Sequence, residues 1–119
     1  MNHTQFNTFC ASLPHTTYVM QWGGSHVWKI GVKVFAVGAN FNNTPAFTFK
    51  TTELSFEMLK DQQGLRPAPY LASRGLKWIQ NYTNNGLNDE ELKAYICQSY
   101  TMVFQSLPKK KQYELNVNT

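Results

Sequence analysis

The sequence predicts an α+β fold in which helices pack on one face of a single antiparallel sheet. Apolar residues recur at helical spacing near both ends of the chain and between residues 53 and 63, whereas between residues 17 and 50 they recur at every second position. Short turns separate the alternating segments, which is typical of antiparallel strands. Each segment is apolar on one side only. A layer of helices packed against one face of a sheet buries all of these apolar sides.

The chain of 119 residues is predicted to form one domain, 1–119, with one core. Its hydrophobic content of 42% is typical of a globular protein. It contains no run of the roughly 18 apolar residues that a membrane span needs, and its first residues lack the basic and apolar regions of a signal peptide. We therefore expect a cytoplasmic protein that makes no membrane contact.

The first predicted element is a helix whose apolar stripe runs from Phe6 to Leu13 and which Pro14 ends. An antiparallel meander then follows over residues 17–22, 26–30, 33–37 and 46–50.

Alternation within these strands predicts which side chains share a face. It places Phe47 and Phe49 inward and Lys50 outward. It also puts Phe35 and Val37 together on one face of the third strand. On one face of the first strand it groups Tyr18, Met20 and Trp22.

A second helix is predicted over residues 53–63, with Thr52 as its cap and Gly64 at its end. Its expected buried stripe consists of Leu54, Met58 and Leu59.

Pro67 and Pro69 forbid regular helix in the segment that follows, and a further strand is predicted over residues 78–82. A capping box of Asn88 and Glu91 opens the long last helix. The expected buried face of this helix consists of Leu92, Ile96, Ser99, Val103 and Leu107. Pro108 ends it, and the tail from about residue 109 is expected to fray.

The charges are distributed unevenly along the chain. The net charge is +4, and no Asp or Glu occurs before Glu53 or between Gln62 and Asn88. The carboxylates therefore fall mainly on the second and last helices. If the strands form one sheet, its polar face is cationic, which suits a polyanion as partner.

Metal-binding and catalytic motifs are missing from the sequence. The three histidines show no HExxH spacing, and there is no CxxC. Cys10 and Cys97 are compatible with a disulfide or with two buried thiols, of which we favour thiols in a reducing cytosol. We expect no metal, no cofactor and no enzymatic activity.

Six short pieces of the sequence resemble one protein family in their order and spacing. They are Phe35-Ala36 after a Gly-x-Lys turn, Phe49-Lys50-Thr51, Arg66-Pro67-Ala68-Pro69-Tyr70, Trp78, Ser99-Tyr100 and Leu107-Pro108-Lys109-Lys110. Together they resemble the MmcQ/YjbR family of small bacterial proteins, from about Phe6 to Lys111. The resemblance implies an α+β domain similar to the frataxin and secretion-chaperone folds, a suggested DNA-binding role in a double-wing arrangement, and no established reaction. Frataxin-like iron binding is not carried over, because the opening helix has no carboxylate.

Nucleic-acid binding needs cations for phosphates and aromatic faces for bases. The candidate residues are Lys50, Arg66, Arg74, Lys77, Trp78 and Tyr70. Arg66 is the first choice, because a guanidinium recognises phosphate or a guanine edge more selectively than an ammonium. A structural role is the alternative: Arg66 would pair with Asp61 or with backbone carbonyls, and Trp28 and Trp78 would be core residues.

The first functional hypothesis is a non-enzymatic DNA-binding or DNA-associated protein of weak sequence specificity. The second is a protein- or peptide-binding adaptor, which predicts an apolar patch formed by Trp22, Trp28, Tyr70 and Tyr82. The third is a small-ligand pocket between the proline segment and the sheet.

Overall fold

The computed structural model describes residues 1–69, 71 and 74–117. It confirms the predicted α+β class: six strands form one antiparallel sheet in the order β1-β2-β3-β4-β6-β5. The elements are α1 (His3–Ser12), β1 (Thr16–Gln21), β2 (Ser25–Ile30), β3 (Lys33–Phe41), β4 (Thr44–Lys50), α2 (Glu53–Leu59), β5 (Leu65–Pro67), β6 (Trp78–Asn81), α3 (Asp89–Gln105) and α4 (Lys109–Val117).

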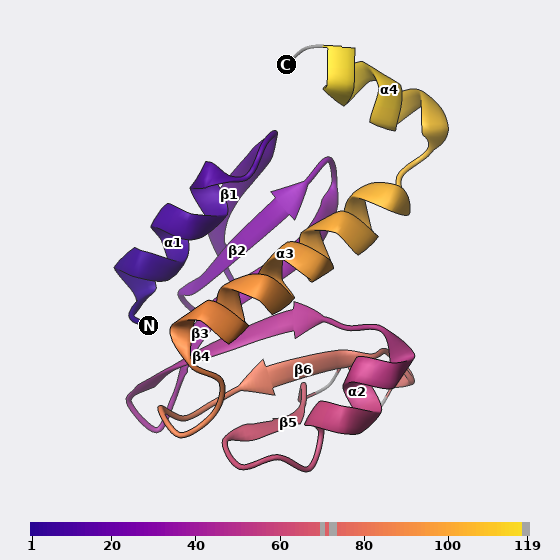
Figure 1. Cartoon of the computed structure of the whole chain (residues 1–119). Helices are drawn as coiled ribbons and strands as arrows, with labels where there is room; N and C mark the ends of the chain where they lie inside the picture. Colours follow the sequence, from indigo (N-terminus) through magenta and orange to yellow (C-terminus); the bar gives the residue numbers. More distant parts are fainter. Residues whose placement is uncertain (70, 72–73, 118–119) are drawn as a thin grey trace.

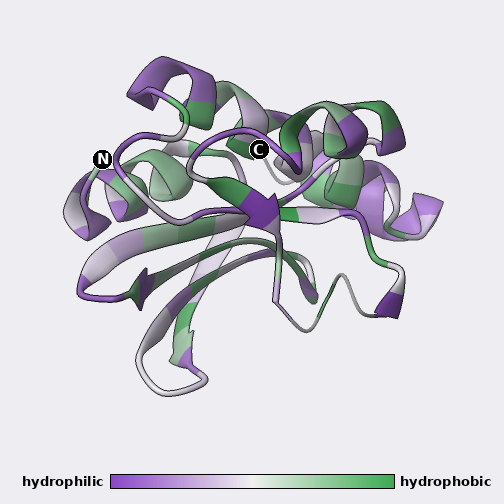
Figure 2. Cartoon of the chain, turned by 90° about the horizontal axis from the view of Figure 1, so that it is seen from below, coloured by the Kyte–Doolittle hydropathy of each residue, from purple (hydrophilic) through white to green (hydrophobic). Residues whose placement is uncertain are grey.

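The helices lie on one side of the sheet (Figures 1 and 2). α1 and α3 cross the strands, α2 lies beside β5 and β6, and α4 projects beyond the end of α3. No described helix covers the opposite side of the strands, which we call the open face. None of the described helices is long and apolar enough to cross a membrane.

The core lies between the sheet and α1 and α3. Phe47 and Phe49 point inward as predicted, and the ring of Phe47 lies 4.8 Å from that of Phe6. Gly38 stands opposite Phe47 in the β3–β4 register. A Cβ at this glycine would lie 2.8 Å from the Phe6 ring, so α1 can approach the sheet only over a residue without a side chain.

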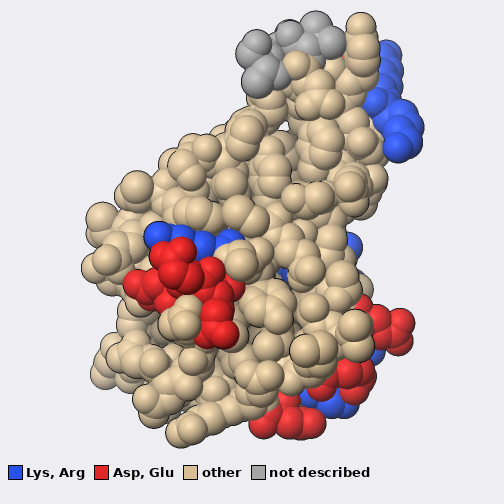
Figure 3. Space-filling view, viewed as in Figure 1, with Lys and Arg blue, Asp and Glu red and all other residues tan. Residues whose placement is uncertain are grey.

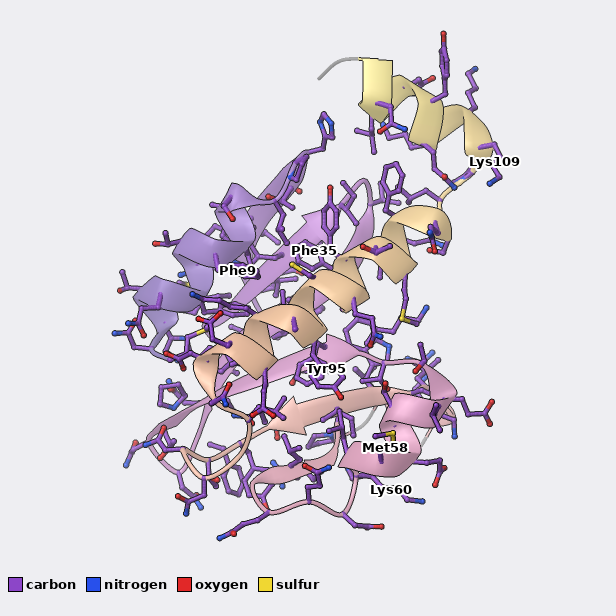
Figure 4. The ribbon with its side chains drawn as sticks, in the orientation of Figure 1. Phe9, Phe35, Met58, Lys60, Tyr95 and Lys109 are labelled. Atoms are coloured by element: carbon purple, nitrogen blue, oxygen red, sulfur yellow. The ribbon has the colours of Figure 1, made fainter. Side chains whose placement is uncertain are left out.

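A β-bulge changes the predicted alternation in β3. The register shifts between Trp28 and Lys29, so that β3 has one residue more than β2 at this point. Phe35 and Ala36 are consequently both buried in the core, and the prediction that Phe35 shares a face with Val37 is wrong. Figure 4 shows Phe35 beneath α3, where its ring meets the edge of Tyr100 at 5.4 Å.

Ser99 satisfies the backbone at this bulge. Its hydroxyl donates to the carbonyl of Phe35 at 2.6 Å and accepts from the amide of Lys50 at 2.9 Å. A fully buried serine on α3 thus connects β3 with β4. Buried backbone groups need hydrogen-bond partners, and where the bulge interrupts the regular strand pairing a side chain must supply them.

α2 is shorter than predicted and turned differently. It buries Phe56 and Leu59, whereas Leu54 is 72% and Met58 58% exposed, so the predicted stripe is correct only for Leu59. The helix spans 7 residues and packs mainly beside β5 and β6, so one i, i+3 pair is enough to cover that contact.

β5 is a short edge strand that the sequence does not predict. Pro67 closes it, which an edge position tolerates because the missing N–H would point away from the ladder.

The chain after Pro108 is helical rather than frayed. Gln112 holds α4 to the end of α3 by donating to the carbonyls of Gln105 at 3.1 Å and Leu107 at 2.7 Å. The three lysines from Lys109 therefore open a helix instead of closing one (Figure 4), and the C-terminal dipole cannot account for them.

Candidate functional site

The open face of the sheet carries no carboxylate. All 7 Asp and Glu residues lie on α2, α3 or α4, apart from Asp61, which follows α2 directly. Figure 3 shows the helix side, where acidic side chains gather over the start of α3 and over α2. The two sides of the sheet therefore differ in electrostatic potential, as the sequence predicts.

Arg66 is held on the open face by three side chains. It stands opposite Gln80 in the β5–β6 register, and its Nε donates to Gln80 Oε1 at 2.8 Å. Its guanidinium carbon lies 4.4 Å from the ring centre of Phe41 and 4.8 Å from that of Tyr82. The two rings meet edge to face at 5.5 Å and keep the guanidinium in place.

No described carboxylate lies within 4.0 Å of Arg66. The pairing with Asp61 that the sequence left open does not occur in the described part of the chain. Stacking leaves the edge of a guanidinium free, and that edge is the part that binds the oxygens of a phosphate.

A groove of about 570 Å³ lies on the open face next to Gln80. Its floor comes from β3 and β4, and its walls come from the β1–β2 turn and from the proline segment. The lining residues are Trp22, Ser25, Val34, Val37, Thr48, Ala68, Pro69, Leu71, Trp78 and Gln80. This is the location that the sequence hypothesis of a small-ligand pocket specifies.

Trp22 is the most exposed of the tryptophans. It is 64% exposed and lies in the β1–β2 turn rather than in the strand, with a φ of 51°. It is therefore not part of a face shared with Tyr18 and Met20, because the left-handed backbone turns its side chain toward the groove. A bulky residue in this conformation is uncommon, and its position does not contribute to the core.

The predicted binding residues fall into three groups. Lys50 and Trp78 are register partners, and both lie on the open face, since Lys50 shares the face of Thr48 and Trp78 lines the groove. Arg66 lies on the same face. Lys77 turns away from it, because its Nζ lies 4.8 Å above the ring of Phe56 on α2.

The remaining predicted residues are placed less fully. Arg74 is exposed in the segment before β6, and Tyr70 lies outside the described residues. Of the aromatic patch predicted for an adaptor, Trp28 is in the core at 7% exposure, where its indole N–H donates to Asn7 Oδ1 at 2.9 Å. Tyr82 packs against Arg66 and Phe41, so among the described residues those four aromatics do not form one patch.

Sequence reasoning missed Phe41 and Gln80, and it did not assign Trp22 or Lys29 to the nucleic-acid site. Gln80 is brought to Arg66 by the pairing of β5 with β6, and Phe41 reaches Arg66 because the pairing of β4 with β6 sets the β3–β4 hairpin beside these strands. Lys29 stands opposite Val34 beyond the bulge, which places it beside the groove on the open face. Only the Gly-Gly turn after Trp22 was a usable signal, because such turns favour left-handed backbone at their edges.

No three His, Cys, Asp or Glu side chains of the described residues form a group that could hold a metal ion. The nearest approach to one is a pair of imidazoles between α1 and β2, with the ring centres of His3 and His26 4.8 Å apart. Desolvation and the neighbouring His3 lower the pKa of His26.

Comparison with solved structures finds the same fold in two bacterial proteins. A Deinococcus radiodurans protein with a DUF419 domain has a TM-score of 0.82 and 20% identity over 95% of this chain and 86% of its own. A Pseudomonas syringae protein has a TM-score of 0.71 and 18% identity over 87% of this chain and 99% of its own. No curated protein matches the chain. The YjbR family model matches residues 11–102, which is most of the chain, and the protein therefore belongs to the YjbR family.

Proposed function

We propose that this protein is a non-enzymatic DNA-binding protein that uses the open face of its sheet. The observation that carries the proposal is the Arg66 guanidinium, which packs against the rings of Phe41 and Tyr82 with no carboxylate of the described residues within 4.0 Å. Structural arginines usually end on a carboxylate or on carbonyls, whereas this one is oriented in advance and keeps hydrogen-bond donors for an outside anion.

Pre-orientation favours binding because the entropy of fixing a long side chain is lost on folding and not again on association. Gln80 holds the Nε edge of the guanidinium, and the rings of Phe41 and Tyr82 pack against the group from adjacent directions. A phosphate can then accept two parallel N–H bonds from the remaining edge.

The surroundings of Arg66 supply the longer-range attraction. Lys50 and Lys29 lie on the same face, and the acidic groups lie on the helices or, in the case of Asp61, directly after α2. With few direct phosphate contacts, we expect weak, largely sequence-independent binding that falls as salt rises, with a slope of only about 0.7 to 0.9 for each contact.

The test is a titration of fluorescently labelled DNA at two salt concentrations with matched charge variants. Arg66→Gln and Lys93→Gln each lower the net charge by one, but Lys93 lies on α3 with Glu90 at 3.8 Å. We expect Arg66→Gln to weaken binding by roughly tenfold and to reduce the salt slope by about 0.7 to 0.9, while Lys93→Gln stays within about twofold of the wild type. Equal effects of the two variants, or no binding by the wild type at low salt, would refute the proposal.

A protein-binding adaptor is the second candidate, and the exposed apolar side chains of α2 favour it. Leu54 and Met58 are adjacent on the outer side of that helix, one turn apart. Replacing both with Gln would abolish recognition of a protein partner while leaving DNA binding unchanged, so the two functions can be separated in one pair of variants.

A further inference from the structure

We propose that the groove between Trp22 and Trp78 is a stacking site for an unpaired base, so that the DNA bound at the open face is single-stranded. This inference rests on the proposed function and assigns the groove a part in it. The groove volume of about 570 Å³ lies within the roughly 300–1,000 Å³ of small-molecule sites, which is large enough for a planar base.

The two indoles reach the groove from opposite sides of its floor. Trp22 comes from the turn between β1 and β2, and Trp78 comes from β6, with β3 and β4 between them in the sheet. A flat aromatic ligand entering over Val37 and Thr48 would therefore find an indole on each side. Bases have a π-face whatever their identity, so such a site is tolerant of sequence.

The residues around the groove favour a ligand that carries a negative charge as well as an aromatic ring. The lining is almost entirely apolar, but one of its few polar members, Gln80, is hydrogen-bonded to Arg66. A base in the groove and a phosphate on Arg66 would therefore lie only one side chain apart. Base and phosphate are similarly close neighbours within one nucleotide. A neutral apolar ligand would not contact Arg66. The lack of carboxylates on the open face would also give such a ligand no advantage over an anionic one.

Duplex DNA does not fit this arrangement. Its bases are stacked and paired, so a sheet face that enters a groove of the duplex reaches only base edges and phosphates, and neither offers the flat ring face on which an indole stacks. The most exposed tryptophan of the chain would then have no partner. An unstacked single strand uses both the groove and Arg66.

The experiment compares binding of one labelled oligothymidine strand with binding of the same strand in a duplex at fixed salt. We expect the wild type to prefer the single strand and Trp22→Ala to lower that affinity about tenfold while leaving the duplex affinity unchanged. Trp22→Phe, which keeps a stacking ring, restores most of the loss. Tyr113→Ala is the matched control, because Tyr113 is 70% exposed on α4, away from the open face.

The outcomes separate this inference from the proposed function. If Arg66→Gln weakens binding but Trp22→Ala does not, or if single strand and duplex bind alike, the stacking site is refuted and the DNA-binding proposal stands. If the wild type binds neither form at low salt, both fail. Unchanged thermal unfolding of Trp22→Ala shows that the change is local, as expected for a turn residue outside the core.

Discussion

The two faces of the sheet use the same residue types in different surroundings. Trp28 and Phe49 on the helix side are covered by α1 and α3, and Trp28 has its indole N–H paired with Asn7. On the open side, Trp78 lines a groove and Phe41 is stacked against a guanidinium. An aromatic ring therefore stabilises the fold on one face, whereas on the other it shapes a surface, and position along the strand decides which.

The faces differ in charge as well as in cover. The acidic side chains sit at the start of α3 and along α2, where Asp89, Glu90 and Glu91 complement a helix dipole. Placing the carboxylates on helices leaves the strand side with cations alone. The same distribution of carboxylates therefore has two results: it stabilises the start of α3, and it leaves the open face without groups that would repel an anion.

The largest contrast is expected between two phenylalanines. Phe49→Ala should lower the free energy of unfolding by about 3–5 kcal/mol, because it opens a cavity in a closed core. Phe41→Ala should cost only about 1 kcal/mol, since Phe41 is half-buried and loses mainly its contact with Arg66. Urea unfolding of both variants measures the difference, and equal losses would show that the open face is a second core.

Phe41→Ala has a further expected effect that Phe49→Ala lacks. Without the ring, Arg66 loses one of its two stacking partners, so DNA binding should weaken severalfold in a protein that remains folded.

An intermediate effect is expected at the bulge. Ser99→Ala leaves the Phe35 carbonyl and the Lys50 amide without their partner and should destabilise the protein by about 1–3 kcal/mol. Thr101→Ala, an exposed position on the same helix, is the control and should change stability by less than about 0.5 kcal/mol. If the two variants unfold at the same urea concentration, the bulge does not depend on this hydroxyl.

The smallest effect is a pH dependence confined to the helix side. The pKa of His26 is lowered below its ordinary 6.5 by desolvation and by His3, so the unfolded chain binds a proton more readily than the folded one. Stability is therefore full above pH 6.5 and declines as the pH falls through the lower folded pKa. Glu57 also has a lowered pKa, through its hydrogen bond to Lys60, but its loss comes below its ordinary 4.5.

Thermal unfolding between about pH 5 and 7 isolates the histidine contribution. His26→Gln should flatten the curve over that range, and an unchanged slope in the variant would place the titrating group elsewhere.

Several features of the fold could be predicted because they depend on neighbours in sequence. Alternation from Phe47 to Lys50 reports which side of a strand is apolar, and the capping box of Asn88 and Glu91 is a contact three residues apart. The bulge at Phe35 could not be predicted, because it depends on how β3 pairs with β2 and on a serine 64 residues away.

The candidate site was predictable only in its composition. Arg66, Lys50 and Trp78 were predicted as binding residues from their residue types, and the structure brings them to one face. Lys77 leaves that face because an aromatic ring on α2 lies within its reach. The long side chain of Lys77 can reach several neighbours, and which of them it contacts depends on how α2 packs beside β6.

By itself, the sequence determined the α+β class, the meander, the strong cap of the last helix and the restriction of carboxylates to helices, because each is written in spacing over a few residues. Tertiary structure alone decided the order of β6 between β4 and β5, the packing of Arg66 against Phe41 and Tyr82, and the groove beside Gln80. These features join residues 14 to 58 positions apart, such as Arg66 with Gln80 or Trp22 with Gln80, and the free energy that selects such pairings comes from packing the whole sheet at once.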